Sequence, residues 1–196
     1  MGVAASVAGL LAVAALAGGC GGDPAGTAAH GPTDGASPAT APGAAMPSGM
    51  TMPSGMPMSD PSATPADRID GAKKSTFTLL DTRPPGTDAA AGTAWLAQND
   101  QGTTVTITMT GLRPGQAYMA HLHAQSCARD NGGPHFRFDP AGPATPPNEI
   151  HLGLTADATG AATATVRNDR KVGDGARAVV VHPMDAMDNR LACADF

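Results

Sequence analysis

The segment from residue 121 to residue 136, HLHAQSCARDNGGPHF, gathers side chains that are able to bind a metal ion. It holds three histidines and a cysteine, whereas the whole chain of 196 residues has six histidines. His121 and His123 are two residues apart in a strand-like run, so alternation places both side chains on one face of a sheet. His135 follows a Gly-Gly-Pro bend, where a loop can turn back towards that sheet. The pattern predicts a metal site.

A fourth histidine joins this set from a distant part of the chain. His182 ends the apolar run ARAVVVH, residues 176–182, so it would project at the rim of the sheet. An all-imidazole site suits copper or zinc, and the affinity order of divalent ions favours copper. The spacing does not match the short Cys/His patterns of structural zinc sites. The alternative for each histidine taken alone is a structural residue whose hydrogen bonds are satisfied in the core.

Chemistry beyond binding needs a group that attracts a substrate. Arg190, close in sequence to Cys193, is the candidate, because a fixed guanidinium near a metal draws small anions. The alternative is a solvated surface arginine.

The elements that must position these residues are short runs rich in Val, Thr and Ala, separated by turn signals. Their spacing predicts an all-β sandwich or barrel, and no stretch of the folded part has helical periodicity. Residues 128–148 form a long Gly- and Pro-rich loop without an element of its own, and such a loop is usually functional. The predicted strands are 75–81, 93–98, 103–112, 118–124, 151–157, 161–167, 176–182 and 191–196.

Composition sets the boundary of the folded domain. All six aromatic residues and all twelve lysines and arginines lie at or after Arg68, so we expect the domain to span residues 68–196. Within this span the twelve basic residues face twelve aspartates and Glu149. This near balance gives no basic footprint and excludes nucleic acid as an expected partner.

The first residues resemble an export signal. Residues 3–17 form an apolar run too short for a comfortable membrane span, and LAGG precedes Cys20. We therefore predict a lipoprotein signal over residues 1–19, cleavage before Cys20, and a lipid on Cys20 that anchors the chain to a membrane. The alternatives are an ordinary export signal and a retained anchor. All three place the domain outside the cytoplasm.

Export decides how the cysteines are interpreted. The chain has three, and a lipidated Cys20 leaves Cys127 and Cys193 as a pair, which an oxidising compartment should bridge. In the chain-entropy model, closing so long a loop stabilises a domain by about 4 kcal/mol.

Residues 20–67 are predicted to be a disordered tether, because their Ala, Gly, Pro, Ser, Thr and Met content cannot bury enough apolar surface to offset the entropy of ordering. The tether contains a near-repeat, MPSGMTMPSGMPM. Thioether sulfur is a soft ligand that suits Cu(I), so the repeat is a candidate for copper capture. The alternative is a low-complexity linker in which methionine is incidental. The candidate ligands are Met46, Met50, Met52, Met56 and Met58.

From Tyr118 to the C-terminus, the set HLH…C…GPHF…VVVHPMD…RLAC resembles the signature of the copper/zinc superoxide dismutases. The resemblance implies an eight-stranded antiparallel Greek-key barrel or sandwich, of the immunoglobulin-like, superoxide dismutase type. It also implies copper that alternates between Cu(II) and Cu(I), oxidising one superoxide to oxygen and reducing the next to hydrogen peroxide.

Matching positions carry the roles of the family's residues. The resemblance implies that Arg190 steers superoxide, that His135 is the bridging histidine that takes up a proton during turnover, and that the two cysteines of the domain form the disulfide. The implied copper ligands are His121, His123, His135 and His182.

The chain departs from the family at the zinc subsite. The family has two further histidines and an aspartate after GPHF, whereas here only His151 follows and Leu154 stands near the expected aspartate. Seven residues separate His182 from Arg190, where the family has a longer electrostatic loop. We therefore expect zinc to be absent, His151 to be a remnant of its site, and the chain to resemble the copper-only branch.

Without zinc, another group must hold the nitrogen of His135 that faces away from copper. Glu149 is the candidate, with His151 as the alternative, while Asp185 or Asp188 would serve in part for the aspartate of the missing loop. Glu149 could instead be a loop carboxylate in water.

Two functions remain open from the sequence. The first is an extracytoplasmic superoxide dismutase, which Arg190 favours because storage needs no anion-steering arginine. The second is a copper storage or delivery lipoprotein on the same fold, which the methionine repeat and the departures at the zinc subsite favour.

Overall fold

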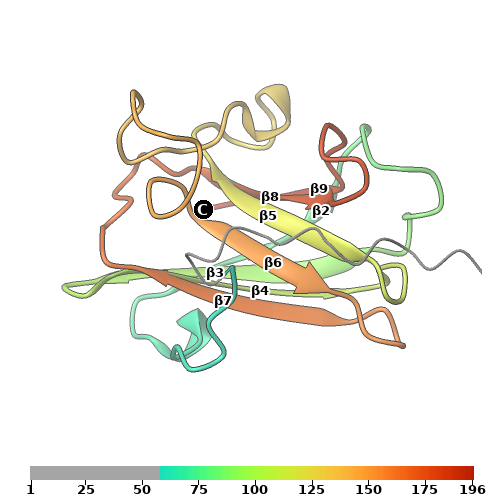
Figure 1. The fold of residues 1–196 in the computed structure, drawn as a ribbon, viewed down its shortest axis with the longest axis horizontal. Coiled ribbons are helices and arrows are strands. Elements are labelled where there is room, and N and C mark those ends of the chain that lie inside the picture. Colours follow the sequence, from blue (N-terminus) through green and yellow to red (C-terminus); the bar gives the residue numbers. More distant parts are fainter. Residues whose placement is uncertain (1–57) are drawn as a thin grey trace, which may run out of the picture. The chain divides into compact units, whose positions relative to one another are not determined.

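The structure is a computed structural model that describes residues 58–196. Two antiparallel sheets pack face to face as a Greek-key β-sandwich (Figure 1). A four-stranded sheet has the order β1-β3-β4-β7, and a five-stranded sheet has the order β2-β9-β8-β5-β6. The strands are β1 (Lys73–Thr76), β2 (Thr78–Leu79), β3 (Ala91–Asn99), β4 (Gly102–Thr110), β5 (Ala117–His123), β6 (His151–Thr155), β7 (Ala162–Asn168), β8 (Ala178–Pro183) and β9 (Ala192–Asp195).

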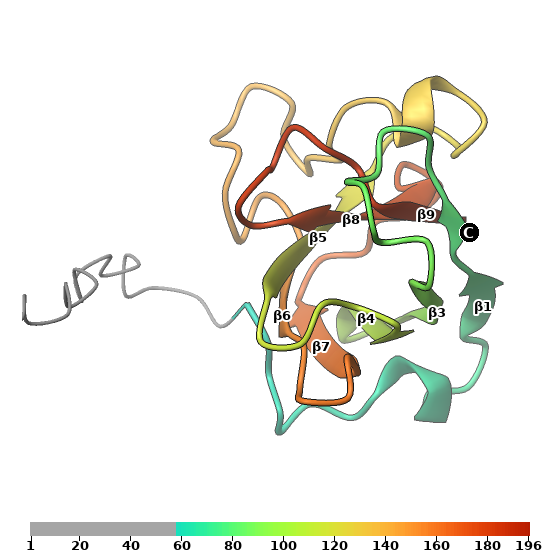
Figure 2. The ribbon, with the colours of Figure 1, turned by 90° about the vertical axis from the view of Figure 1, so that its right-hand side faces the viewer.

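The strand order defines the Greek key. β4 pairs with β7 and β5 pairs with β8, so each of these neighbours is reached by a crossover between the sheets. In the turned view the two layers are separate, and the long connections of the five-stranded sheet lie on its outer side (Figure 2). The all-β prediction is confirmed.

The first strand is divided, which explains why nine strands are present where eight were expected. β1 pairs with β3 in one sheet and β2 pairs with β9 in the other. Between them Phe77 is buried in the core, and its N–H donates to the carbonyl of Gly92. The chain thus switches sheets at Phe77 and closes this edge of the sandwich.

The opposite edge lies between β6 and β7. Gly153 of β6 donates its N–H to the carbonyl of Met58, and Asp60 donates its N–H to the carbonyl of Thr165 in β7. Ala66 is fully buried, in a 3-10 helix, η1 (Ala66–Arg68). The packed part of the chain therefore begins before residue 68. Met58 and Asp60 pair with backbone groups at the edges of both sheets, which would otherwise stay open.

The long loop between β5 and β6 was expected to have no element of its own, and this is wrong in one place. A short 3-10 helix, η2 (Asp130–Gly132), lies within it. Asp130 and Asn131 both have positive φ, and Gly132 and Gly133 follow with positive φ as well. Asp, Asn and Gly are the residues that tolerate this region best.

The predictions for the signal, for Cys20 and for Met46 to Met56 fall on residues outside the described part. Within residues 58–196, no helix has the length and apolar character needed to cross a membrane.

Cys127 and Cys193 form a disulfide, as predicted. Cys193 is in β9 and buried, and Cys127 belongs to the loop that carries His135. The bond therefore joins this loop to the sheet across a sequence separation of 66 residues.

We predict that replacing both Cys127 and Cys193 by alanine lowers the free energy of unfolding by about 2–4 kcal/mol, because the unfolded chain regains the entropy of the open loop. Urea unfolding of the full chain measures the change. Cys20 is replaced by serine in both proteins to prevent wrong pairing. A reductant should destabilise the protein with the disulfide and leave the double variant unchanged. Equal midpoints with and without the disulfide would contradict the prediction.

Candidate metal centre

The outer face of the five-stranded sheet carries the candidate site. On β5, Tyr118, Ala120 and Leu122 are in the core cluster, so alternation directs His121 and His123 to the outer face. On β8, Val179 and Val181 are in the core cluster, and His182 faces outward for the same reason. β5 and β8 are adjacent, with His121 opposite Val180. Pairing of β5 with β8 thus brings His182 next to His121 and His123, from which it is far apart in sequence.

His135 reaches this face from the loop. It forms an isolated β-bridge with His123. The N–H of Phe136 donates to the carbonyl of Leu122, and the N–H of Ala124 donates to the carbonyl of Pro134. The loop therefore turns back onto β5 at the predicted Gly-Gly-Pro bend. Gly132 packs against His123 so closely that an added Cβ would lie 3.3 Å from the His123 Cβ.

One ring nitrogen from each of the four histidines lies within 4.8 Å of those of the others. A metal with bonds of about 2.0 Å to imidazole holds opposite nitrogens about 4 Å apart, so a small contraction would close the set around an ion. The rings of His121 and His135 are stacked, with centroids 4.1 Å apart. The four residues are His121, His123, His135 and His182.

Backbone carbonyls fix the tautomers of two ligands. His123 Nδ1 is 2.9 Å from the carbonyl of Gly133, and His182 Nδ1 is 2.9 Å from that of Met187 and 3.1 Å from that of Asn189. A carbonyl can only accept, so each Nδ1 carries the proton and each Nε2 of the neutral ring keeps its lone pair.

The other ring nitrogens of His123 and His182, and one of His121, have no hydrogen-bond partner in the described part of the chain. Among residues 58–196, the buried side-chain atoms without a hydrogen-bond partner are His121 Nδ1, His123 Nε2 and His182 Nε2. A buried polar atom without a partner is costly and calls for a physical reason. A metal ion bound by these lone pairs would supply it, so the residues fit a metal.

The histidines are held in the form that binds metal. Burial lowers the pKa of His123 to about 3, while the hydrogen bond to Gly133 acts in the opposite direction. Burial also lowers the pKa of His121 and His182, with the neighbouring histidines adding to the effect. These three rings are therefore neutral near pH 7, and a metal does not have to displace protons from them.

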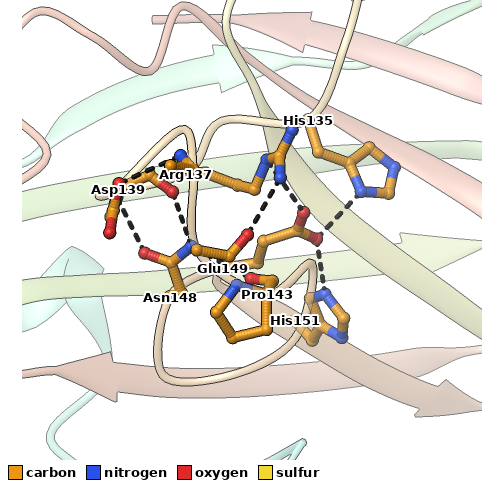
Figure 3. A network of polar contacts seen from close by, with 9 residues as sticks. His135, Arg137, Asp139, Pro143, Asn148, Glu149 and His151 are labelled. Atoms are coloured by element: carbon orange, nitrogen blue, oxygen red, sulfur yellow. Dashed lines mark hydrogen bonds and ion pairs between the residues drawn. The ribbon is translucent and has the colours of Figure 1, made fainter.

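Glu149 lies between His135 and His151 and is linked to both (Figure 3). Its Oε2 is 2.9 Å from His135 Nδ1 and 2.9 Å from His151 Nε2, and its Oε1 is 3.9 Å from Arg137 Nε. Only 2% of the Glu149 side chain is exposed. Glu149 is thus a buried acceptor shared by two imidazoles, and His135 Nε2 is left for the cluster.

The loop holds Glu149 through Asn148. The Asn148 side-chain amide donates to the carbonyls of Asp139 and Pro143, and its oxygen accepts the N–H of Asp139 (Figure 3). The Glu149 N–H donates to the carbonyl of Thr145. These bonds fix the end of the loop just before β6 begins, so Glu149 has a defined position.

The remaining predicted residues lie elsewhere. His151 contacts the His121 ring, at 4.3 Å between centroids, but its Nε2 bonds Glu149 and it is outside the four-histidine cluster. Asp185 is exposed and accepts from Gln116 Nε2 at 2.7 Å. It has no hydrogen bond to the four histidines in residues 58–196, and neither has Asp188.

Arg190 lies beside the cluster in a fixed position. Its guanidinium donates to the carbonyls of Asp130, at 2.6 Å, and Asn131, at 3.0 Å. Burial and then the neighbouring His135 lower the pKa of His123 and His182, and the positive charge of Arg190 adds a smaller effect in the same direction. Both carbonyls belong to residues of η2 with positive φ.

The fold and the site define a Greek-key β-sandwich with a candidate four-histidine metal centre on the outer face of one sheet. No family model and no curated protein matches the chain. Among solved structures, the chain is similar to a Cu/Zn superoxide dismutase from Brucella abortus, with 21% sequence identity and a TM-score of 0.44. The match covers 63% of this chain and 98% of that chain. The assignment of the fold comes from the strand order and pairing of this chain itself.

Sequence reasoning missed the groups that orient the ligands. Gly133, Met187 and Asn189 act through carbonyl oxygens, which any residue type offers, so no side-chain pattern marks them. Arg137, close to Glu149, was also missed, although a cation near the only glutamate of the chain was a usable signal.

We predict that the metal-free protein loses stability as the pH falls from about 7 to about 5, because unfolded histidines take up protons near pH 6.5 whereas the three buried ones resist protonation. The stability they confer is present above about pH 6.5 and declines below it, by at most about 1.4 kcal/mol per pH unit for each histidine. Urea unfolding of the metal-free full chain measures the slope. His182→Gln removes one of the three groups and should make the slope shallower; an unchanged slope would contradict the assignment.

Proposed function

We propose that this chain is a copper-dependent superoxide dismutase that works without zinc. The observation that supports this best is the set of orphaned nitrogens, three buried lone pairs that converge on one point together with His135. Such a site has the donor set of a copper centre, and among residues 58–196 its cluster includes no cysteine thiol or carboxylate. His121, His123, His135 and His182 would hold the copper.

Bound copper, alternating between Cu(II) and Cu(I), would oxidise one superoxide to oxygen and reduce the next to hydrogen peroxide, with an uptake of two protons. The chain supplies the proton path. His135 Nδ1 would pass a proton along its hydrogen bond with Glu149, whose same oxygen also bonds His151 Nε2. Glu149 would thus take over the task that zinc performs at the bridging histidine.

Arg190 would act on the substrate. Superoxide is a small anion, and a guanidinium held by two carbonyls offers its charge at a constant position next to the cluster. Because the carbonyls are neutral acceptors, they orient the group without cancelling its charge. A surface arginine paired with a carboxylate would attract anions less.

The proposal also includes the location. The disulfide fits an oxidising compartment. We propose export directed by residues 1–19 and a lipid on Cys20, with residues 20–57 linking the membrane anchor to the described domain. Capture of Cu(I) by Met46, Met50, Met52 and Met56 remains part of this proposal.

We expect the copper-loaded full chain to dismutate superoxide well above free copper, and Arg190→Ala to lower the rate by about tenfold, because electrostatic guidance of a charged substrate is worth at least that much. Pulse radiolysis at equal copper content measures both proteins. The rate of the unchanged protein should fall as ionic strength rises, and the variant should lose much of this dependence.

Arg68→Ala is the matched control, since Arg68 is exposed in η1, which packs against β3 and β4 of the other sheet, and its loss should not matter. Full copper occupancy without dismutation would exclude the enzyme and favour a storage or delivery protein. Zinc bound together with copper in equal amount would contradict the claim that the enzyme works without zinc.

Glu149→Gln keeps the shape of the side chain but replaces the shared acceptor by an amide that cannot carry the proton. We predict retained copper and a fall in dismutation of about tenfold or more, the usual range for loss of a group that supports a metal ligand. Asp185→Asn makes the same chemical change at an exposed carboxylate bonded to Gln116, and it should leave the rate unchanged. Equal rates for both variants would remove Glu149 from the mechanism.

A further inference from the structure

A second group of metal-binding side chains lies on the same face of the sheet. A surface cavity of about 310 Å³ has the side chains of Met58, Met119 and Met184 in its wall. No charged residue lines it. Of the other methionines among residues 58–196, Met109 is in the core and Met187 is 39% exposed. Three methionines therefore line one cavity whose other lining residues, Ser59, Tyr118 and Thr155 among them, carry no charge.

Strand pairing puts this cavity next to the histidine cluster. Met119 is two residues before His121 on β5, so both side chains project from the same face about 7 Å apart. Met119 is also directly opposite His182 on β8, at a position where β-carbons are about 5 Å apart. Met184 follows β8, and its N–H donates to the carbonyl of Ala117. Met119 thus shares a cross-strand row with His182 and lies one step along β5 from His121.

Met58 completes the group because a glycine lies beneath it. Gly153 is opposite Met119 on β6, and its N–H donates to the carbonyl of Met58. A Cβ on residue 153 would lie 3.2 Å from the Met58 Cβ, tighter than most real contacts. The absent side chain lets Met58 lie across the strand towards Met119.

Thioethers bind Cu(I) in preference to hard divalent ions. Methionine is also a common filler of apolar gaps in a core, but these three methionines line a surface cavity. We propose that Met58, Met119 and Met184 form a Cu(I) site that passes copper to the adjacent histidine cluster. The transfer exchanges Cu–S bonds for Cu–N bonds, copper stays Cu(I), and no electron moves. The site does not depend on whether the cluster dismutates superoxide.

The test uses the full chain with methionine methyl groups labelled with carbon-13 and Ag(I) as a redox-inert probe for Cu(I). Met46, Met50, Met52 and Met56 are replaced by leucine, so that other thioethers of the repeat do not compete. We expect the methyl signals of Met58, Met119 and Met184 to move together, while the signals of Met109 and Met187 stay. Movement of Met119 alone would place Ag(I) in the histidine cluster and overturn the proposal, as would no movement.

A variant separates this site from simple packing. Met119→Leu with Met184→Leu conserves volume, so the fold should persist, which thermal unfolding checks. We expect Ag(I) binding at Met58 to weaken by at least about tenfold, the effect that loss of even a supporting group has on a metal site. Cu(I) loading of the histidine cluster should slow by a similar factor. Met109→Leu, a volume-conserving change at a core methionine outside both sites, is the matched control and should change neither. Loading at an unchanged rate would overturn the transfer step, whatever the dismutase activity.

Discussion

The alternation of side chains along β5 is the constraint on which the rest of the site depends. Tyr118, Ala120 and Leu122 are buried in the core, and burial of these side chains fixes which face the intervening residues occupy. A shift of register by one residue would turn His121 and His123 into the core and lose both the site and the packing. The hydrophobic effect that stabilises the sandwich therefore also sets the position of the ligands.

The sheet alone supplies three ligands, and the loop must add the fourth. Three connections hold the loop against the sheet: the disulfide, the contact of Arg190 with η2, and the backbone bonds of Phe136 and Ala124 with β5. They come from different parts of the chain and act on different parts of the loop. Ordering a long loop costs conformational entropy. The three connections together offset this cost and hold His135 at the cluster.

The sequence predicts the strands and the histidine set because both follow from local patterns, period-two alternation and residue type. It predicts the pair Cys127 and Cys193 from the cysteine count. It does not predict the division of the first strand at Phe77, since that depends on which neighbour each half meets. Nor does it predict that Glu149 is shared with His151, because the contact arises only when the loop ends where β6 begins.

Three imidazoles of the cluster differ in whether their hydrogen-bond partner is a backbone carbonyl or a carboxyl group. His123 and His182 are held by backbone carbonyls, which accept a hydrogen bond but neither give nor take a proton near neutral pH. His135 is held by a carboxyl group, which can do both, and a second imidazole lies on the same oxygen. In the proposed dismutase, His135 is therefore the histidine through which a proton would leave or enter the cluster. A protein that only stored copper would be served equally well by a carbonyl at that place.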